Sequence, residues 1–344
     1  MNWVGAANDH DTDIVIYNGQ PAICYRDLAA RSSRVARRTG AGQWTIENVS
    51  NDASSGEFCE IDVLAGALVT AFSHGTELRF ANRQANGSWT VTTVDTVGGR
   101  TVGVDPSMVI RNGVPYIAHQ DETNGLLRLS RRLNGRWTTV ATPAPGDLNG
   151  DGLPDKFGFR PGLVVLENDI RILHGLVPAQ PDQGSDYSLR ISVIGHDLAA
   201  FQTSNLQATG FGGGQAVMAY EEGFLGAVRR RDRDAVFGSR GGLYLVKAAG
   251  NYSWNPLEFY DGGVNHTYRR ISIEADPFGL PLIGFADLQQ GDEVCVYRPN
   301  DADRDQLPDV EELRRGTDPD RADTDGDGVS DGDEVFNGTD PLAR

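Results

Sequence analysis

Lysine, cysteine and long apolar stretches are scarce in this chain of 344 residues. Only Lys156 and Lys247 are lysines, so arginine supplies nearly all of the 31 basic residues. No apolar run reaches the roughly 18 residues that a membrane-spanning helix needs, and we therefore expect no transmembrane segment. The start of the chain, MNWVGAANDH, has neither a basic segment nor an apolar core, so we expect that a secretion signal is absent or was removed.

Three cysteines are too few for a disulfide scaffold, and an odd number leaves at least one free thiol. Cys24 and Cys59 can pair if their strands are neighbours. The alternative is that these two and Cys295 are small buried side chains that only pack.

Acidic residues outnumber basic ones by 48 to 31, which gives a net charge of −17. A chain this acidic disfavours a nucleic-acid partner, because phosphates are repelled. The one basic cluster, Arg229 to Arg233, is expected to pair with nearby acids. No HExxH, GxSxG or P-loop pattern occurs, so we assign no catalytic residue.

The end of the chain repeats itself with a period of 22 residues. DADRDQLPDVEELRRGTDPDRA begins at Asp301, and DTDGDGVSDGDEVFNGTDPLAR begins at Asp323. Residues 301–344 hold 15 acids and 5 arginines, a net of −10 (5 − 15), which is more than half of the whole excess. Carboxylates crowded in this way repel one another unless cations neutralise them.

The spacing of these acids is that of a calcium loop. Ca²⁺ takes six to eight oxygen ligands, and an EF-hand loop supplies them from positions 1, 3, 5, 7, 9 and 12. Gly328 gives the second loop its sharp turn at position 6, whereas Gln306 stands there in the first and predicts a strained or weaker loop. The predicted ligands are Asp301, Asp303, Asp305, the Leu307 carbonyl, Asp309 and Glu312, and Asp323, Asp325, Asp327, the Val329 carbonyl, Asp331 and Glu334.

The pattern DxDxDGxxDxxE followed by GTDP resembles the thrombospondin type 3 repeat of bacterial extracellular proteins. The resemblance covers only about residues 301–344. It implies Ca²⁺ as a cofactor, a compact rod with little apolar core, and a secreted or cell-surface setting. The alternative is a disordered acidic tail, which the repeated pattern disfavours.

A partial third copy lies inside the chain, from Asp147 to Asp155. Position 12 of this copy is Gly158 in place of Glu, so a cation here needs a further ligand from elsewhere or binds weakly. The alternative is a simple Asn-Gly/Asp-Gly turn. The predicted ligands are Asp147, Asn149, Asp151, the Leu153 carbonyl and Asp155.

Residues 1–299 contain a second, degenerate repeat. Pairs of short strands joined by a tight turn recur along the chain. The glycines of the first three turns, Gly19, Gly66 and Gly113, are 47 residues apart. Two more strands follow in most copies, and the Trp of each Asn/Gly-x-Trp motif is expected to pack in the core. A unit of 40–50 residues with four strands is typical of a β-propeller blade. We count six copies, at 10–50, 56–98, 102–143, 158–207, 210–260 and 266–299.

The sixth copy lacks a Trp, and Trp3 is expected to supply it, so that the N-terminal strand closes the ring. The predicted fold is thus an all-β, six-bladed propeller over residues 1–299, followed by a small calcium-binding tail over residues 300–344. We expect a monomer.

Loops at one edge of the blades are where propellers commonly bind ligands. Second strands end, and first strands begin, at this edge. The residues predicted to bind a ligand there are Asp27, His74, Asp121, Arg160, Arg230 and Arg269. His119 and His174 stand where other copies have Tyr25 and Phe72, and we interpret them as structural.

Two functions remain open from the sequence. The first is a secreted, calcium-binding propeller that binds a glycan or a cell-surface protein; a purely structural surface protein is its simpler version. The second is a polysaccharide-active enzyme, a lyase or a glycosidase, on the same face. Phe159-Arg160-Pro161 only partly matches the entry motif of sialidases, and no Asp box occurs. A lyase could draw on His74, His119, Tyr220, Arg230, Tyr268 and Arg269.

Overall fold

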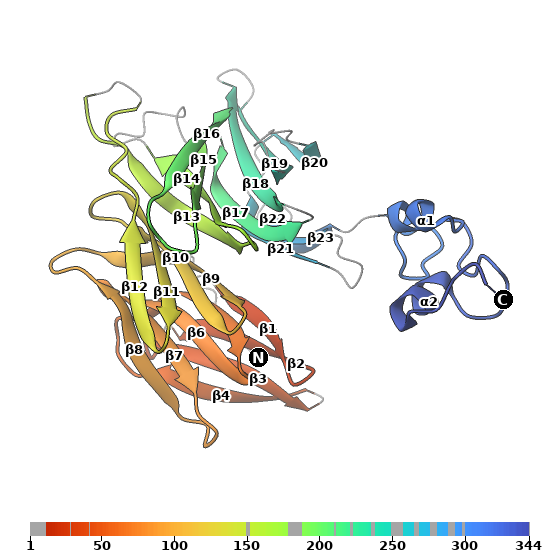
Figure 1. Ribbon diagram of the computed structural model, residues 1–344, viewed down its shortest axis with the longest axis horizontal. Helices are drawn as coiled ribbons and strands as arrows, with labels where there is room; N and C mark the ends of the chain where they lie inside the picture. Colours follow the sequence, from red (N-terminus) through yellow and green to blue (C-terminus); the bar gives the residue numbers. More distant parts are fainter. Residues whose placement is uncertain are drawn as a thin grey trace. The chain divides into compact units, whose positions relative to one another are not determined.

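The protein is described by a computed structural model that covers residues 12–27, 29–40, 42–148, 152–177, 188–209, 211–220, 223–234, 238–248, 257–264, 268–275, 281–287, 293–297 and 300–343. The chain divides into two compact units, Met1–Asn265 and His266–Arg344. Apart from two short helices in the second unit, the regular structure of the described residues is entirely β (Figure 1). The predicted border at residues 299 and 300 stays a prediction.

Four-stranded antiparallel sheets follow one another along the first unit, each made of four consecutive strands in chain order. This meander is the repeated unit that the sequence predicts. The first sheet contains β1 (Asp13–Tyr17), β2 (Gln20–Asp27), β3 (Ser32–Gly40) and β4 (Gln43–Ser50), and the second contains β5 (Ser55–Leu64), β6 (Ala67–His74), β7 (Glu77–Arg83) and β8 (Trp89–Thr96). The third sheet contains β9 (Val102–Arg111), β10 (Val114–Asp121), β11 (Leu126–Leu133) and β12 (Arg136–Ala141), and the fourth contains β13 (Lys156–Val165), β14 (Ile170–Val177), β15 (Ser188–Ile194) and β16 (Gln202–Thr209). The fifth sheet contains β17 (Phe211–Tyr220), β18 (Gly223–Asp234), β19 (Gly238–Ala248) and β20 (Leu257–Val264).

The second unit holds a three-stranded sheet and the acidic tail. Its strands are β21 (Tyr268–Ala275), β22 (Pro281–Asp287) and β23 (Glu293–Tyr297). The tail forms two helices of seven residues each, α1 (Asp309–Arg315) and α2 (Asp331–Asn337). Trp3, which we expect to complete the sixth sheet, lies outside the described residues.

Asn-Gly turns explain why the strands reverse where they do. Asn18, Asn112 and their glycines all have positive φ values, between 50° and 73°, as a two-residue hairpin turn requires. The registers agree, because Tyr17 pairs with Gln20 and Arg111 pairs with Val114 across these turns.

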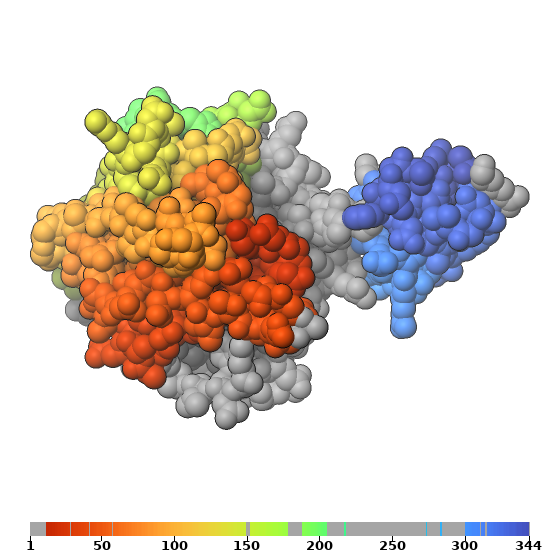
Figure 2. Space-filling model, turned by 90° about the horizontal axis from the view of Figure 1, so that it is seen from below, coloured from red at the N-terminus to blue at the C-terminus, as the bar shows by residue number. Residues whose placement is uncertain are grey.

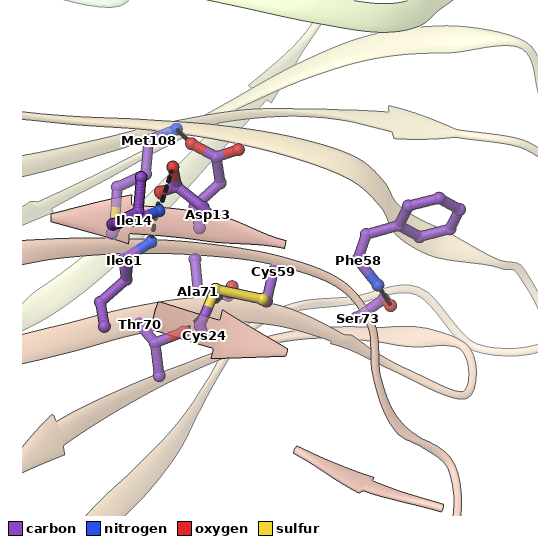
Figure 3. The surroundings of a disulfide bond; sticks show 11 residues. Asp13, Ile14, Cys24, Phe58, Cys59, Ile61, Thr70, Ala71, Ser73 and Met108 are labelled. Carbon is purple, nitrogen blue, oxygen red and sulfur yellow. Dashed lines mark hydrogen bonds between the residues drawn. A yellow bond between two sulfur atoms is a disulfide. The ribbon is translucent and has the colours of Figure 1, made fainter. Parts of the chain in front are cut away.

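Consecutive sheets pack through their first strands, in the order β1, β5, β9, β13 and β17. One side chain of each of three first strands accepts a backbone N–H from the next first strand. Asp13 Oδ2 accepts from Ile61 at 2.8 Å (Figure 3). Glu60 Oε2 accepts from Met108 at 3.3 Å, and Ser107 Oγ accepts from Leu163 at 3.2 Å. Asp13, Glu60 and Ser107 are 47 residues apart (13 to 60, 60 to 107). The repeat therefore places the same kind of hydrogen bond between neighbouring sheets.

A glycine near the start of each following first strand lets the sheets approach closely. Gly56, Gly103 and Gly158 have φ values of 81°, 78° and 81°. A Cβ on Gly103 would lie 2.7 Å from the Cα of Leu78, and those on Gly56 and Gly158 would lie 2.9 Å from backbone atoms of the preceding sheet. No other residue fits these positions without moving the backbone.

Tryptophans pack between sheets, as expected for core residues. The Trp137 ring meets Phe80 of the preceding sheet edge-on, with centroids 5.3 Å apart. Trp89 lies against the core formed by the first two sheets and donates its indole N–H to Glu47 Oε2 at 3.1 Å. Burial alone would raise the pKa of Glu47, but hydrogen bonds from Arg83 and Arg37 outweigh it and lower that pKa.

A disulfide joins the first two sheets. Cys24 of β2 and Cys59 of β5 are bonded, with their Cα atoms 6.3 Å apart, and both are fully buried (Figure 3). The alternative of unpaired packing thiols is therefore wrong for this pair. In the space-filling view, the first two sheets, coloured red to orange, form one continuous surface (Figure 2). Within the described residues no helix is long and apolar enough to cross a membrane.

Candidate functional site

One edge of the sheets in the first unit gathers most of the residues predicted to bind a ligand. We call it the entry face, because each first strand begins there and each second strand ends there. The strand registers define it: Ser55 pairs with His74, Val102 with Asp121, and Lys156 with Val177. Asp27, His74, Asp121 and Arg160 all belong to this edge.

Asp27, the last residue of β2, is held by its own sheet. Its Oδ2 lies 2.8 Å from Arg34 Nε, and its Oδ1 accepts the backbone N–H of Ala30 at 2.9 Å. Both side chains of the ion pair remain about a quarter exposed. Asp27 therefore offers a ligand a neutralised carboxylate at the rim.

His74 is oriented from both sides of its ring. Its Nδ1 lies 3.0 Å from Ser55 Oγ, and its Nε2 lies 3.2 Å from Asp52 Oδ2. The three residue types are those of a hydrolase triad, but Ser55 is fully buried and cannot reach a substrate. The arrangement holds the imidazole in place and leaves Asp52 half-exposed beside it.

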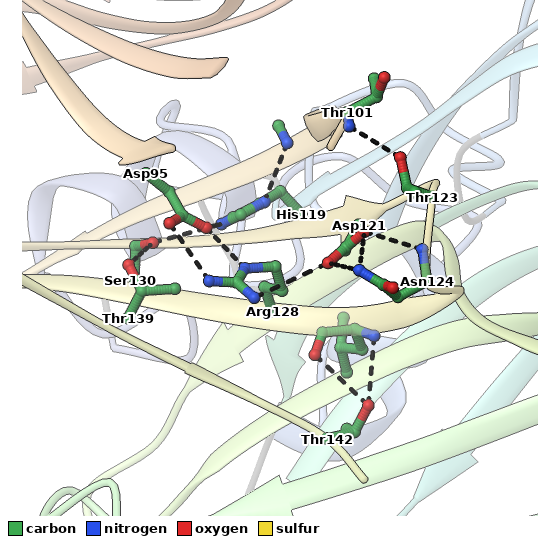
Figure 4. A network of polar contacts seen from close by, with 12 residues as sticks. Asp95, Thr101, His119, Asp121, Thr123, Asn124, Arg128, Ser130, Thr139 and Thr142 are labelled. Carbon is green, nitrogen blue, oxygen red and sulfur yellow. Dashed lines mark hydrogen bonds and ion pairs between the residues drawn. The ribbon is translucent and has the colours of Figure 1, made fainter. Parts of the chain in front are cut away.

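Asp121 is fully buried, so it does not face solvent (Figure 4). Asn124 donates to both of its oxygens, at 3.1 and 2.8 Å, and Arg128 lies 3.8 Å away. The same Arg128 makes a bidentate pair with Asp95 of the preceding sheet, at 2.6 and 3.2 Å. Asp121 thus shapes the turn after β10 and helps to join two sheets.

Arg160 stands at a strained corner that has a counterpart in the preceding sheet. Gly158-Phe159-Arg160-Pro161 and Gly103-Val104-Asp105-Pro106 occupy equivalent places at the starts of β13 and β9. Arg160 and Asp105 have φ values of 45° and 46°, in the left-handed region and directly before a proline. The Arg160 guanidinium lies over the Phe159 ring, 5.5 Å from its centroid. Asp105 was not among the residues that we selected as ligands.

The two buried histidines hold these corners. His174 Nδ1 accepts the N–H of Gly158 at 3.2 Å, and His119 Nδ1 accepts that of Gly103 at 3.1 Å. Each Nε2 meets a serine, Ser192 at 2.9 Å or Ser130 at 3.3 Å (Figure 4). Each serine continues to a threonine of the fourth strand at 2.7 Å.

Burial sets the protonation state of both histidines. It lowers the pKa of His119 to about 4, against a smaller opposite effect of Asp95. It lowers the pKa of His174 to about 4 as well, opposed by the Gly175 backbone. A neutral imidazole is also what an Nδ1 that accepts a hydrogen bond requires. These geometries fit a structural role.

Arg230 and Arg269 complete the predicted set. In the strand registers Arg230 of β18 pairs with Phe211 and Gly242, and Arg269 of β21 pairs with Ala286. Their side chains lie outside what the structure describes, and Arg269 belongs to the second unit.

The acidic tail forms two loops that converge their first three acids. The carboxylates of Asp301, Asp303 and Asp305 offer oxygens within 4.8 Å of one another, and so do those of Asp323, Asp325 and Asp327. Each cluster of this kind can hold a metal ion.

The loops close through their ninth residues. Asp309 Oδ1 accepts the N–H of Ala302 at 2.8 Å, and Asp331 Oδ1 accepts that of Thr324 at 2.9 Å. The backbone N–H groups of Asp309 and Asp331 bond the carbonyls of residues 300 and 322, both at 2.9 Å. Asp309 and Asp331 thus also join the two ends of their loops by hydrogen bonds, which spacing alone did not indicate.

Buried oxygens without partners fit a cation in each loop. Glu312 and Glu334, at position 12, are almost wholly buried, and each has an Oε2 with no hydrogen-bond partner. Asp303 Oδ2 is in the same situation. Burial and the neighbouring Asp303 and Asp305 raise the pKa of Glu312 to about 7. Glu312 and Glu334 with the aspartates would supply the hard oxygen ligands that calcium prefers.

The internal segment 147–155 closes in the same manner. Asp155 Oδ2 accepts the N–H of Leu148 at 2.8 Å, and the Asp155 N–H bonds the Gly146 carbonyl at 2.7 Å. Asp147 Oδ2 accepts the N–H of Gly152 at 2.8 Å, as Asp323 Oδ2 does from Gly328 at 3.0 Å. The predicted ligands Asn149 and Asp151 lie outside the described residues, so a cation here stays a prediction.

Known proteins resemble this chain in two ways, through a sequence match in the acidic tail and through similarity of fold over most of the chain. Residues 323–343 match the family described as Bacterial TSP3 repeat, which covers the second acidic repeat. No curated protein matches the sequence significantly.

Several solved structures are similar in fold. An alpha-L-arabinanase from Penicillium chrysogenum, complexed with arabinobiose, has a TM-score of 0.54 and 13% identity, with 83% of this chain and 91% of that chain covered. A mutant alpha-L-arabinofuranosidase from Fusarium graminearum, in complex with an iminosugar inhibitor, has a TM-score of 0.51 and 13% identity, covering 83% and 92%. Polysaccharide lyase Uly1 has a TM-score of 0.50 and 11% identity, covering 80% and 73%. At such low identities the likeness concerns the fold alone.

Proposed function

We propose that this protein acts on a polysaccharide at the entry face of a six-bladed β-propeller. The observation that carries the proposal is the likeness of fold over 83% of the chain to the arabinanase that was solved with arabinobiose. The entry face supports it, because Asp27, His74 and Arg160 bring carboxylate, imidazole and guanidinium groups to one edge of the sheets. Neither a lyase nor a glycosidase is singled out by these groups.

Six blades are part of this proposal. Five four-stranded sheets and one three-stranded sheet in the described residues support that number, and a strand from the N-terminus would complete the sixth.

We further propose that the tail binds Ca²⁺ and that the protein is secreted or held at the cell surface. The converging aspartates, the partnerless Glu312 and Glu334 oxygens and the matched repeat support calcium. The buried Cys24–Cys59 disulfide supports an oxidising compartment.

The test is turnover on a panel of polysaccharides in the presence of calcium. The panel contains arabinan, xylan, pectin and uronate-rich algal polysaccharides. New reducing ends without ultraviolet absorbance would indicate a glycosidase, and new ends with the absorbance of an unsaturated uronate would indicate a lyase. Absence of both turnover and binding across the panel would contradict the proposal.

Binding without turnover is the second candidate. The observation that favours it is that Asp27 is paired with Arg34 and Asp121 is buried, so neither of these carboxylates is poised as a free acid or base. A glycan array in the presence of calcium distinguishes the two candidates: retention without product release supports the binding protein.

A further inference from the structure

We propose that the two calcium loops of the tail are coupled, so that an ion bound in one loop raises the affinity of the other loop. This inference rests on the calcium binding proposed above and goes beyond it, because two loops of this spacing could equally bind their ions independently. It assigns the coupling to two residues outside the predicted ligand set, Gly332 and Thr324.

The two loops are alike in sequence but differ in burial. At position 5, Asp305 is 5% exposed and buried, whereas Asp327 is exposed. At position 7, Leu307 is fully buried, whereas Val329 is 42% exposed. The glutamate at position 12 is buried in both loops and has an oxygen without a hydrogen-bond partner, so both loops fit a cation. The first loop is therefore covered where the second is open.

The start of α2 covers the first loop. Asp305 Oδ2 accepts the backbone N–H of Gly332 at 2.7 Å, while its Oδ1 accepts the N–H of Leu307 at 2.7 Å. A Cβ on Gly332 would overlap the Asp305 carbonyl oxygen and lie 3.1 Å from the Leu307 nitrogen. Glycine is therefore required at position 332 for the helix to approach the loop this closely.

This contact joins the ligands of one ion to those of the other. Asp305 is a predicted ligand at position 5 of the first loop. Gly332 is position 10 of the second loop and lies between two of its predicted ligands, Asp331 and Glu334. The hydrogen bond needs the Asp305 carboxylate in the orientation that the first loop gives it, and it needs the first turn of α2 to be formed. Ordering one loop therefore removes part of the entropy cost of ordering the other.

A second connection between the repeats runs through Thr324. Its hydroxyl accepts the N–H of Asp318, which belongs to the Gly-Thr-Asp-Pro segment of the first repeat, at 2.9 Å. The same hydroxyl donates to Asp331 Oδ2 at 2.6 Å. Ala302 stands at the equivalent position of the first loop and has no hydroxyl. The end of the first repeat thus helps to orient a predicted ligand of the second ion.

The experiment is calorimetric titration of the whole calcium-free protein with calcium. Glu334→Gln leaves the first loop with its full ligand set, Glu312→Gln leaves the second, and the double variant gives the baseline for calcium bound elsewhere. Once the affinity of each loop alone is known, the wild-type isotherm has one free quantity, the factor by which loading one loop tightens the other. We expect this factor to be about 5 to 150, and by linkage it is the same in both directions.

Two further variants test the contact while every predicted ligand stays in place. Gly332→Ala and Thr324→Val should each lower the coupling factor, because each removes one connection between the repeats. Phe336→Ala, on the same helix at a side chain that is 72% exposed, is the matched control and should keep the factor.

Three results would contradict these expectations in different ways. A wild-type isotherm equal to the sum of the two single-loop isotherms would overturn the coupling while calcium binding stands. A factor that both Gly332→Ala and Thr324→Val retain would overturn its assignment to this contact. A wild-type isotherm equal to that of the double variant would overturn calcium binding by the tail itself.

Discussion

Asp305 Oδ2 accepts the backbone N–H of Gly332 at 2.7 Å, so an acid of the first loop holds the first turn of the helix in the second repeat. The other oxygen of Asp305 accepts the N–H of Leu307 within its own loop, also at 2.7 Å. A Cβ on Gly332 would lie 2.2 Å from the Asp305 carbonyl oxygen, so the two repeats touch through backbone atoms. The tail is therefore one folded body made of two repeats.

We expect chelation of calcium to unfold this body while the sheets of the chain stay folded. Its carboxylates crowd around buried oxygens, and without a cation their repulsion is uncompensated. Thermal unfolding followed with and without a chelator should show one transition that moves with calcium and one that does not. A single transition that moves as a whole would contradict the separation.

The first loop should gain stability from glycine. Arg304 and Gln306 have φ values of 65° and 81°, where the second loop has Gly326 and Gly328 at 79° and 100°. Gln306→Gly should stabilise the calcium-loaded tail by about 1 kcal/mol, because a side chain in the left-handed region is strained. Gly328→Gln is the mirror control and should destabilise it by a similar amount. Calcium-dependent melting of both variants measures the difference.

Gly103→Ala should be far more damaging than an alanine in an equally left-handed turn. Its Cβ would lie 2.7 Å from the Leu78 Cα, and backbone cannot move aside cheaply. We expect a loss of about 3 kcal/mol or more in the free energy of unfolding. Gly113→Ala, with a φ of 73° and open space around its Cβ, is the control and should cost about 1 kcal/mol. If both variants lost the same free energy of unfolding, close contact between the sheets would not be the reason for glycine at position 103.

Acid should destabilise the first unit through its buried histidines. The folded pKa values of His119 and His174 lie near 4, below that of an exposed histidine, so the unfolded chain binds more protons. Their contribution is fully present above about pH 6.5 and is lost as the pH falls through about 4, on the order of 3 kcal/mol for each. Denaturant unfolding at pH 7 and pH 5 measures the loss.

His119→Phe is the matched variant for this prediction, because Phe72 fills the equivalent position in the second sheet. It should remove about half of the pH dependence between pH 7 and pH 5, because His174 remains. If the free energy of unfolding of His119→Phe varied with pH as steeply as that of the wild type, the protons would be taken up by groups other than His119.

Loss of the disulfide should weaken the first two sheets. Cys24 and Cys59 are 35 residues apart, and a cross-link over such a loop removes chain entropy worth about 4 kcal/mol from the unfolded state. Cys59→Ala should lower the melting temperature and make it insensitive to reductant. A wild type whose melting temperature is equally insensitive would contradict this role.

The local elements were predictable because their causes are local. Asn18-Gly19 and Asn112-Gly113 set hairpin turns, and alternating apolar residues on either side set the strands. The acidic loops were predictable in the same way, since positions 1, 3 and 5 of each loop converge through the loop's own backbone. Equivalent spacing also placed Asp27, His74 and Asp121 at the strand ends of one edge, and Arg160 was assigned to that edge from its place near the start of a first strand.

What happens to a side chain at that edge was not predictable from spacing. Asp121 became a buried member of a network with Arg128 and Asp95, a residue of the preceding sheet. The left-handed corner at Asp105 was not predicted, because it depends on Gly103 and on His119, which lies 16 residues from that glycine. The recurring Gly-x-x-Pro at residues 103–106 and 158–161 was the signal that could have found it.

The sequence by itself determined the repeat, the strand and turn pattern, the acidic loops and the edge where polar residues gather, because each depends on residues a few positions apart. The tertiary structure decided which cysteines pair, which acids are buried and which corners are strained. Those outcomes depend on contacts between sheets, from 35 residues for the disulfide to 56 for Ser107 and Leu163, and no local pattern records which neighbour arrives there.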